Sequence, residues 1–232
     1  MSPLVTRILK MLVVLLIPIV LVLGSVRVLT TDAYLTFAYG KPGFPSDTYG
    51  FTSRQRFILA SINIHYVQAH LPENELSKQT LNGKPVYNER EVSHMADVQN
   101  VFQYVLRIWQ YALVLLLLLG LIFWRSGRLQ DLASGLYTGG IVTSTLILSI
   151  GLFAGFAWET WFNLFHRFIF VPGSWIFSYA DTLIRLFPAQ FWFDATLSLS
   201  ILSFGGGLLA ALLGWKWQDD RTHRPKDVVV AG

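Results

Sequence analysis

The sequence predicts an all-α membrane protein with four transmembrane helices and a small, partly irregular extracytoplasmic cap that can include a short β-hairpin. Hydrophobic residues make up 53% of the chain and charged residues only 14%, whereas soluble domains carry about 25% charged residues. Four apolar stretches reach the length of about 20 residues that a helix needs to cross a bilayer. They lie at residues 8–29, 104–124, 132–156 and 195–217.

The apolar stretches carry ionisable side chains only near their ends, at Lys10, Arg27 and Arg107. Ion pathways and proton relays usually place such groups in the middle of the membrane. The sequence therefore disfavours a pump or an ion-coupled transporter. It favours helices that anchor and position other parts of the protein.

Basic residues near the ends of the apolar stretches indicate the orientation. They cluster in short segments on one face, which is typical of a cytoplasmic face: Arg7, Lys10, Arg125, Arg128, Lys216, Arg221, Arg224 and Lys226. We therefore expect one membrane domain over residues 1–232, with residues 30–103 and 157–194 forming the cap. Residues 218–232 are expected to form a cytoplasmic tail.

The first apolar stretch is predicted to be a retained span. Arg7 and Lys10 precede it, as in a cleaved signal peptide, but it is longer than a usual signal core and has no clear small-residue cleavage pair. Pro18 is tolerated inside a membrane helix. The rest of the topology is the same in either case.

The cap elements are predicted from local signals. Residues 32–51 are rich in Pro, Gly and Tyr and are expected to be irregular. Thr52 or Ser53 can cap a helix over residues 54–69, which Pro72 is expected to end. Asn82 and Gly83 predict the tight turn of a small hairpin.

Asn88 and Glu91 form a capping-box pattern that predicts a helix from about Glu89 into the second span. His94 lies three residues from both Glu91 and Asp97, so either carboxylate can approach the imidazole and fix its tautomer. The alternative is a solvated first turn that carries an incidental histidine.

A second histidine, His166, is followed by Arg167 inside the aromatic segment Trp158–Tyr179. Of the 34 aromatic residues in the chain, 15 lie between Phe153 and Phe193. Aromatic belts at a bilayer surface are ordinary anchors, but polar groups among rings need partners. His94 and His166 each lie about ten residues from the end of a span. They could converge there and divide base and acid roles.

Other kinds of site receive less support. Without cysteine, the chain has no thiol nucleophile, disulfide or thiolate metal site. His65 and His70 with a third histidine lack a recognised zinc spacing, and His223 lies in the basic tail. No cofactor is expected. No interleaved basic and aromatic pattern indicates a nucleic-acid partner.

Three sequence blocks resemble the bacterial lipoprotein intramolecular transacylases. These blocks are NEREVSHMADVQNVF at 88–102, FHRFIF with the following GSWIF at 165–177, and DTLIRLFPAQFWFD at 181–194. Together with four spans in the same order, the resemblance covers most of residues 49–217. Residues 30–47 and the tail contribute no match.

The resemblance implies an acyltransferase of the bacterial cytoplasmic membrane whose cap and active site are extracytoplasmic. Such an enzyme moves the sn-2 acyl chain of a diacylated lipoprotein to the α-amino group of its N-terminal cysteine, giving the lyso-form. Attack of this amine on the ester closes an eight-membered ring. The implied partners are the lipoprotein and membrane lipids. Alternatives are another membrane lipid acyltransferase or esterase, or a non-enzymatic scaffold or binding protein.

The resemblance also places His94 and His166 at the two catalytic histidine positions. We expect His94 to be the base, oriented by Glu91, and His166 to be the acid or polarising partner, although the roles can be exchanged. Supporting residues are expected to contact the lipoprotein backbone or the developing oxyanion, or to position the site: Asn88, Arg90, Glu91, Asp97, Arg167, Arg185 and Asp194.

Overall fold

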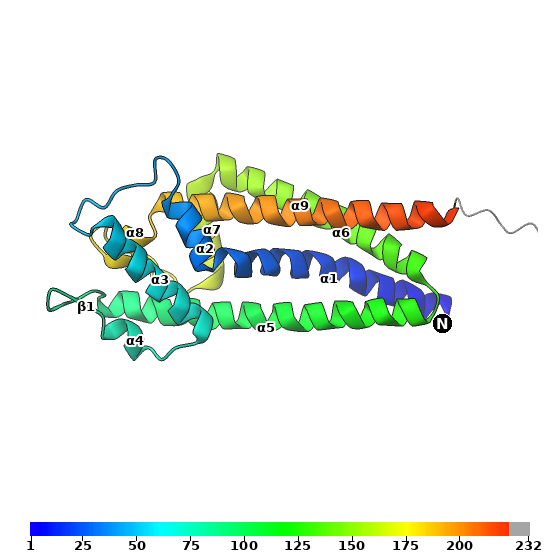
Figure 1. Ribbon diagram of the computed structural model, residues 1–232, viewed down its shortest axis with the longest axis horizontal. Coiled ribbons are helices and arrows are strands. Elements are labelled where there is room, and N and C mark those ends of the chain that lie inside the picture. The colour runs from blue at the N-terminus through cyan, green and yellow to red at the C-terminus, as the bar shows by residue number, and fades with distance from the viewer. Residues whose placement is uncertain (223–232) are drawn as a thin grey trace, which may run out of the picture. The chain divides into compact units, whose positions relative to one another are not determined.

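The computed structural model describes residues 1–222, with side chains as far as Asp219. Within these residues, four helices are long and apolar enough to cross a membrane: α1 (Pro3–Leu29), α5 (Glu89–Arg125), α6 (Leu129–Phe156) and α9 (Ala189–Thr222). They contain all four predicted stretches, so the protein is a multi-pass α-helical membrane protein (Figure 1). The predictions for His223, Arg224 and Lys226, and for the side chain of Arg221, lie outside the described residues.

Shorter elements connect the long helices. They are α2 (Asp32–Tyr39), α3 (Ser53–Ala69), α4 (Asn74–Ser77), β1 (Thr80–Leu81), β2 (Lys84–Pro85), α7 (Trp158–Ile169) and α8 (Thr182–Leu186). The chain divides into two compact units. The first contains Met1–Val22, Trp109–Leu148 and the chain from Ile201 onward. The second contains Leu23–Ile108 and Ser149–Ser200.

The first unit is held by close approach of helix backbones. A Cβ added at Gly140 of α6 would overlap the carbonyl oxygen of Gly207 in α9, so only glycine permits this crossing. Small residues commonly allow such contact between membrane helices. The indole of Trp109 in α5 donates to the carbonyl of Val20 in α1, 3.2 Å away, which satisfies a polar group that lipid could not.

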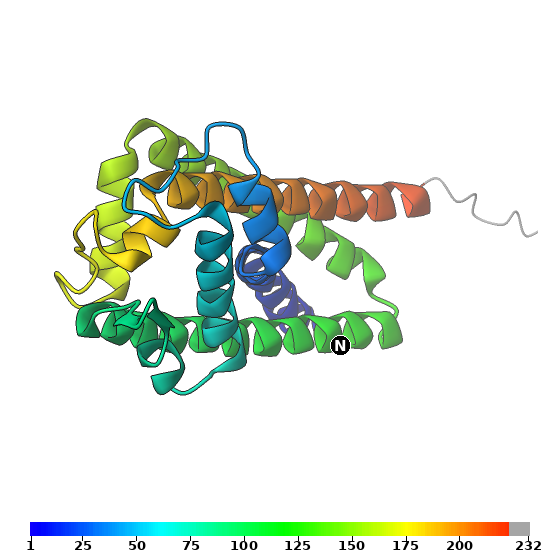
Figure 2. The same ribbon diagram turned by 60° about the vertical axis from the view of Figure 1, so that its left-hand side comes forward.

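In the second unit, α3 packs against the beginning of α5 (Figure 2). The Gln99 side chain of α5 donates to the carbonyls of Tyr66 and Leu71, each at 2.8 Å, and Gln103 donates to Val67 at 2.9 Å. Tyr66 and Val67 lie in the last turn of α3 and Leu71 follows it, at a helix end where side chains commonly bind backbone carbonyls. The contacts fix the first turns of α5, from which His94 projects.

The capping signal at Thr52 is confirmed. Its hydroxyl accepts from the Gln55 backbone N–H at 3.2 Å, and the Gln55 side chain accepts from the Thr52 N–H at 2.8 Å. The predicted last residue of this helix is also confirmed, three residues before Pro72. Helix α3 ends at Ala69, because His70 adopts a left-handed conformation with φ of 53°.

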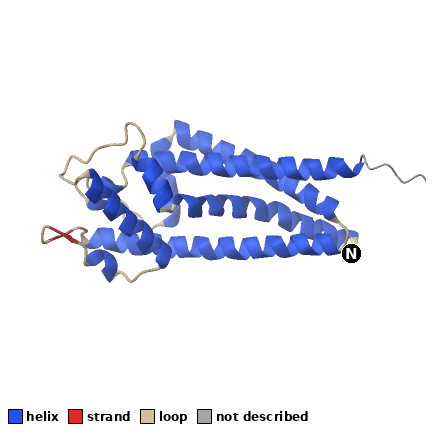
Figure 3. Ribbon diagram, in the orientation of Figure 1, coloured by secondary structure: helices blue, strands red, loops and turns tan. Residues whose placement is uncertain are grey.

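The hairpin is also confirmed (Figure 3). Leu81 pairs with Lys84 across Asn82 and Gly83, whose φ angles are 53° and 75°. Two successive positive φ angles are typical of the type I′ turn that matches strand twist.

The expectation that residues 32–51 are irregular is wrong for its first part. Residues Asp32–Tyr39 form α2, because the Thr31 hydroxyl accepts from the Tyr34 N–H at 3.3 Å and Asp32 places an acidic group in the first turn. Leu35 is completely buried. Only the segment after Gly40 lacks regular structure until α3 begins.

Candidate active site

The first turn of α5 is fixed by the predicted capping box. The Asn88 side chain accepts from the Glu91 N–H at 3.0 Å, and the Glu91 carboxylate accepts from the Asn88 N–H at 2.9 Å. The other carboxylate oxygen accepts from the backbone N–H of Leu183 in α8 at 2.7 Å. Glu91 is 1% exposed. Its carboxylate therefore joins α5 to α8 through backbone donors.

This arrangement corrects the expectation that Glu91 orients His94. Both oxygens of Glu91 are engaged by backbone N–H groups. No hydrogen bond or ion pair within residues 1–222 connects Asp97 with the imidazole. His94 Nδ1 is buried and has no hydrogen-bond partner among the described residues. No carboxylate bond therefore fixes the tautomer of His94.

Aromatic rings hold the His94 imidazole instead. Its centroid lies 5.1 Å from that of Phe170 and 5.4 Å from that of Phe177. His94 itself is only 9% exposed. Both phenylalanines belong to the segment between α7 and α8.

His166 has a defined tautomer. Its Nδ1 lies 2.8 Å from the carbonyl oxygen of Phe162, one turn earlier in α7. Because a carbonyl can only accept, Nδ1 carries the hydrogen, and Nε2 of the neutral ring keeps its lone pair.

Rings also surround His166, with centroids 4.0 Å away for Phe162, 5.6 Å for Trp175 and 5.7 Å for Phe170. Burial among them lowers the pKa of the His166 imidazole below its ordinary value, and the hydrogen bond to Phe162 opposes this shift. The neutral form is therefore favoured at neutral pH.

Phe170 contacts both imidazoles, with centroid distances of 5.1 Å to His94 and 5.7 Å to His166. The structure thus brings the two predicted histidines, which are far apart in the sequence, to the same aromatic cluster. The sequence signalled the abundance of rings, but it did not distinguish Phe170 from its neighbours.

Three polar side chains at the beginning of α5 bind the chain that follows α7: Asn88, Arg90 and Glu91. Arg90 donates to the carbonyl of Ile176 at 2.7 Å, and its guanidinium lies 5.7 Å from the Phe177 ring centroid. Asn88 donates to Asp181 at 3.1 Å. With Glu91, these residues hold the segment that supplies Phe170 and Phe177. Asp181 was missed in the sequence because its partner lies 93 residues away.

The remaining predicted residues have other positions. Arg185 donates to the Asp47 carboxylate at 2.8 and 3.0 Å, and its guanidinium lies 3.4 Å from the Phe51 ring centroid. The hydrogen bonds from Arg185 hold the pKa of the Asp47 carboxyl below its usual range. Asp194 pairs with Lys41 at 2.7 Å. Arg185 and Asp194 therefore bind the segment between α2 and α3 rather than either imidazole, while Arg167 is exposed on α7.

The weaker histidine candidates make no metal cluster among the described residues. His65 lies 2.8 Å from Asp32, which also accepts from Ser61 at 2.7 Å. His70 instead ends α3.

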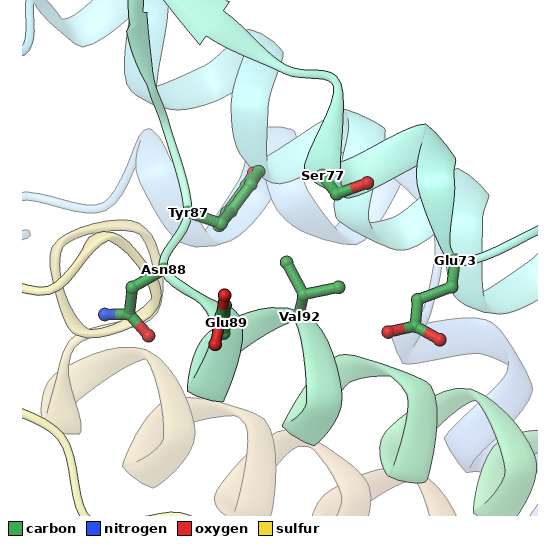
Figure 4. Close-up of a pocket in the computed structure, with 6 residues that line it drawn as sticks. All are labelled: Glu73, Ser77, Tyr87, Asn88, Glu89 and Val92. Atoms are coloured by element: carbon green, nitrogen blue, oxygen red, sulfur yellow. The ribbon is translucent and has the colours of Figure 1, made fainter.

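Two cavities in the described chain lie apart from the imidazoles. One, of about 250 Å³, is lined by Glu73, Ser77, Tyr87, Asn88, Glu89 and Val92 (Figure 4). The other, of about 380 Å³, lies beside the Asp47–Arg185 pair. Neither is lined by His94 or His166.

Comparisons with known proteins agree with this architecture. The family model of the lipoprotein intramolecular transacylase Lit matches residues 11–192. An uncharacterized protein of Aquifex aeolicus (strain VF5) is 32% identical over 209 residues, which cover 90% of this chain and 94% of the relative.

The membrane-integral lipoprotein intramolecular transacylase Lit of Bacillus cereus has a similar fold, with a TM-score of 0.73 and 15% identity. The match covers 95% of this chain and 99% of that one. A structure of the same protein with one histidine changed to arginine has a TM-score of 0.61 and 16% identity, and covers 95% of both chains. From the family match, the chain belongs to the lipoprotein intramolecular transacylases, which are membrane acyltransferases.

Proposed function

We propose that the protein transfers the sn-2 acyl chain of a diacylglyceryl lipoprotein to the α-amino group of its N-terminal cysteine, with His94 and His166 as the catalytic residues. The observation that carries this proposal is the contact of both imidazoles with Phe170. The family relationship supports the kind of reaction.

The tautomer of His166 suits it to the role of base, which exchanges the roles first expected. Its Nδ1–H is engaged by Phe162, so Nε2 presents a lone pair. Burial favours the neutral ring, which can accept a proton. In this mechanism, the amine nitrogen of the substrate bonds to the ester carbonyl carbon while Nε2 of His166 takes a proton from that amine.

His94 is suited to the role of hydrogen-bond donor. Its Nδ1 is buried without a partner, and an unpaired buried N–H is rarer than an unpaired acceptor. The proton is therefore assigned to Nε2, where it can donate to the oxygen that becomes negative in the tetrahedral intermediate.

The intermediate collapses when the bond between the carbonyl carbon and the glyceryl oxygen breaks. His166 returns its proton to that oxygen, which leaves an amide, a free glyceryl hydroxyl and the neutral histidine. All atoms come from the substrate, so no enzyme-bound acyl group is required. The chain has no cysteine to carry one as a thioester.

The packed rings can lower the entropic cost of ring closure in this reaction. Closing an eight-membered ring costs conformational freedom, and a confined site can hold the substrate near its reactive shape. The same rings exclude water, which would otherwise hydrolyse the ester. Phe170, Phe177 and Trp175 provide this confinement.

We place the site on the extracytoplasmic side of the bacterial cytoplasmic membrane. Arg7, Lys10, Arg125 and Arg128 lie near the ends of α1, α5 and α6 that are remote in sequence from the histidines. This density of basic residues in short segments is typical of a cytoplasmic face.

Reconstitution with a synthetic diacylated lipopeptide tests the function. Transacylation leaves the total mass unchanged, while tandem mass spectrometry finds one acyl group on the cysteine nitrogen. Fatty acid release would identify an esterase. Acylation of a second lipid would identify an intermolecular acyltransferase, and either result would overturn the proposal.

A further inference from the structure

One face of α7 is apolar and, beyond Trp161, is exposed rather than covered by protein. Trp161, Leu164, Phe165 and Phe168 follow the i, i+3, i+4, i+7 spacing of a single helix face. Leu164 is 50% exposed and Phe168 is 90% exposed. A stripe that packed on the protein core would be buried, so this stripe requires another explanation.

The remainder of α7 has two different faces. Glu159, Thr160, Asn163 and Arg167 are exposed and polar. His166 is 8% exposed and packs beside Phe162. This third, narrow face packs against the protein and carries the proposed base, and beside it the Trp158 and Trp161 rings contact Phe193 and Phe153.

The chain connection indicates what covers the apolar face. Helix α7 follows α6, which is long and apolar enough to cross a membrane, and only Ala157 separates them. Ala157 leaves the helical conformation with φ of −133° and ψ of 53°, and Figure 2 shows α7 turning away from α6. A helix that starts where a membrane span ends begins at the level of the bilayer surface.

We propose that α7 lies in the bilayer interface with Trp161, Leu164, Phe165 and Phe168 in contact with lipid acyl chains. An amphipathic helix with separate polar and apolar faces typically lies in this plane. The occupant of the exposed face is therefore bilayer lipid. Continuity with α6 favours lipid over a second protein chain.

This placement sets the depth of the site, a consequence that rests on the proposed function. The ester carbonyl of a diacylglyceryl group lies at the boundary between headgroups and acyl chains. A helix in the same plane holds His166 at that level. The acyl chains can then remain in the hydrocarbon while the ester reacts.

The natural absence of cysteine permits a direct test. Single variants Leu164→Cys and Phe168→Cys, with Thr160→Cys and Asn163→Cys as matched controls on the polar face, are labelled with a nitroxide. The proteins are placed in vesicles of phosphatidylethanolamine and phosphatidylglycerol. Electron paramagnetic resonance then compares access of oxygen, which concentrates in lipid, with access of a water-soluble nickel complex.

Labels at 164 and 168 are expected to relax preferentially with oxygen, and labels at 160 and 163 with nickel. Equal nickel access on both faces would place α7 in water. Exclusion of both reagents at 168 would indicate a protein cover, including a second copy of the chain. Either result would overturn the proposed surface, and neither depends on catalytic turnover.

The same orientation predicts an effect on activity in vesicles. Phe168→Asp puts a charge on the lipid-facing side and is expected to reduce turnover several-fold, whereas Phe168→Leu and the matched Asn163→Asp should resemble the unmodified protein. Size-exclusion chromatography checks folding. Unchanged turnover in folded Phe168→Asp would overturn the link between this face and the site. Absence of transacylation in the unmodified protein would instead refute the proposed function.

Discussion

At the scale of single residues, the two histidines are held by different means. His166 packs among rings and also bonds to a carbonyl of its own helix, whereas His94 packs among rings and its Nδ1 has no hydrogen-bond partner among the described residues. Replacement of a general base typically lowers a rate by about 10²- to 10⁴-fold. We expect a loss of this order for His166→Asn in the lipopeptide assay. Activity near that of the unmodified protein would remove His166 from the mechanism.

The pH dependence of His166 follows from its lowered pKa. A neutral base acts only when unprotonated, and the lowered pKa keeps His166 neutral to more acidic pH than an ordinary histidine. Its titration should therefore be centred below 6.5, the usual value for histidine. NMR of ¹⁵N-histidine-labelled protein, with His166→Asn to assign the signal, measures this midpoint. A midpoint at or above 6.5 would contradict the buried environment.

Arg90 is expected to be a positioning residue that acts through Phe177 on His94. Arg90→Gln removes the charged donor to the Ile176 carbonyl and the cation above the ring. We expect about a tenfold lower kcat, the equivalent of about 1.4 kcal/mol, with partial rescue by Arg90→Lys. His94 should also react faster with diethylpyrocarbonate.

Arg54→Gln is a matched control, because Arg54 is exposed on α3. If Arg90→Gln lowered kcat without changing the reactivity of His94, the route through Phe177 would be wrong.

The extent to which the site could be predicted depends on distance along the chain. Asn88 and Glu91 formed the expected box because its bonds join residues three apart. The three-residue spacing also predicted a contact between Glu91 and His94. Instead, the second carboxylate oxygen of Glu91 accepts from the backbone N–H of Leu183, 92 residues away. A long-range backbone donor leaves no mark in a single sequence.

At the scale of elements, capping decides where several helices begin. The cap on α5 serves the site as well as stability, because Asn88 also binds Asp181. Asn88→Ala should lower the free energy of unfolding by about 1 kcal/mol and also reduce activity. Thermal unfolding in detergent and the lipopeptide assay measure the two effects.

Thr52→Ala removes the comparable cap of α3 and provides the control. It should lower stability by a similar amount with activity retained. Equal loss of activity in both variants would mean that Asn88 acts only through general stability.

Helix α2 shows why element prediction was incomplete. The composition of residues 32–51 suggested turns, yet Pro and Gly are confined to the part after Tyr39. The preceding Thr31 and Asp32 are ordinary helix-starting residues. Judging residues 32–51 by their overall composition concealed this short helix. Its buried residues, Tyr34, Leu35 and Ala38, follow the spacing of one helix face.

At the scale of the whole molecule, length and hydropathy determined the four spans, because the bilayer imposes a minimum helix length. The pairing of those spans was beyond the sequence. It depends on which glycines meet, and α9 alone contains three in succession at Gly205, Gly206 and Gly207. Only the structure distinguishes them.

These glycines predict opposite effects of one substitution. A Cβ at Gly207 would overlap Ser144 Oγ and the Gly140 carbonyl, so Gly207→Ala should destabilise the protein by about 1–3 kcal/mol. A Cβ at Gly205 has nothing within 4 Å, so Gly205→Ala should stabilise the helix by about 0.5–1 kcal/mol. Thermal unfolding in detergent compares them. Equal shifts of the same sign would contradict the helix crossing.

Because the Phe170 ring contacts both imidazoles, it links the exposure of one histidine to the exposure of the other. In the proposed mechanism, a substrate that pushed this ring aside would uncover the proposed base and the proposed hydrogen-bond donor in one movement. Neither histidine is then presented to the ester without the other. Binding of the lipid and exposure of the proposed pair would then be a single event.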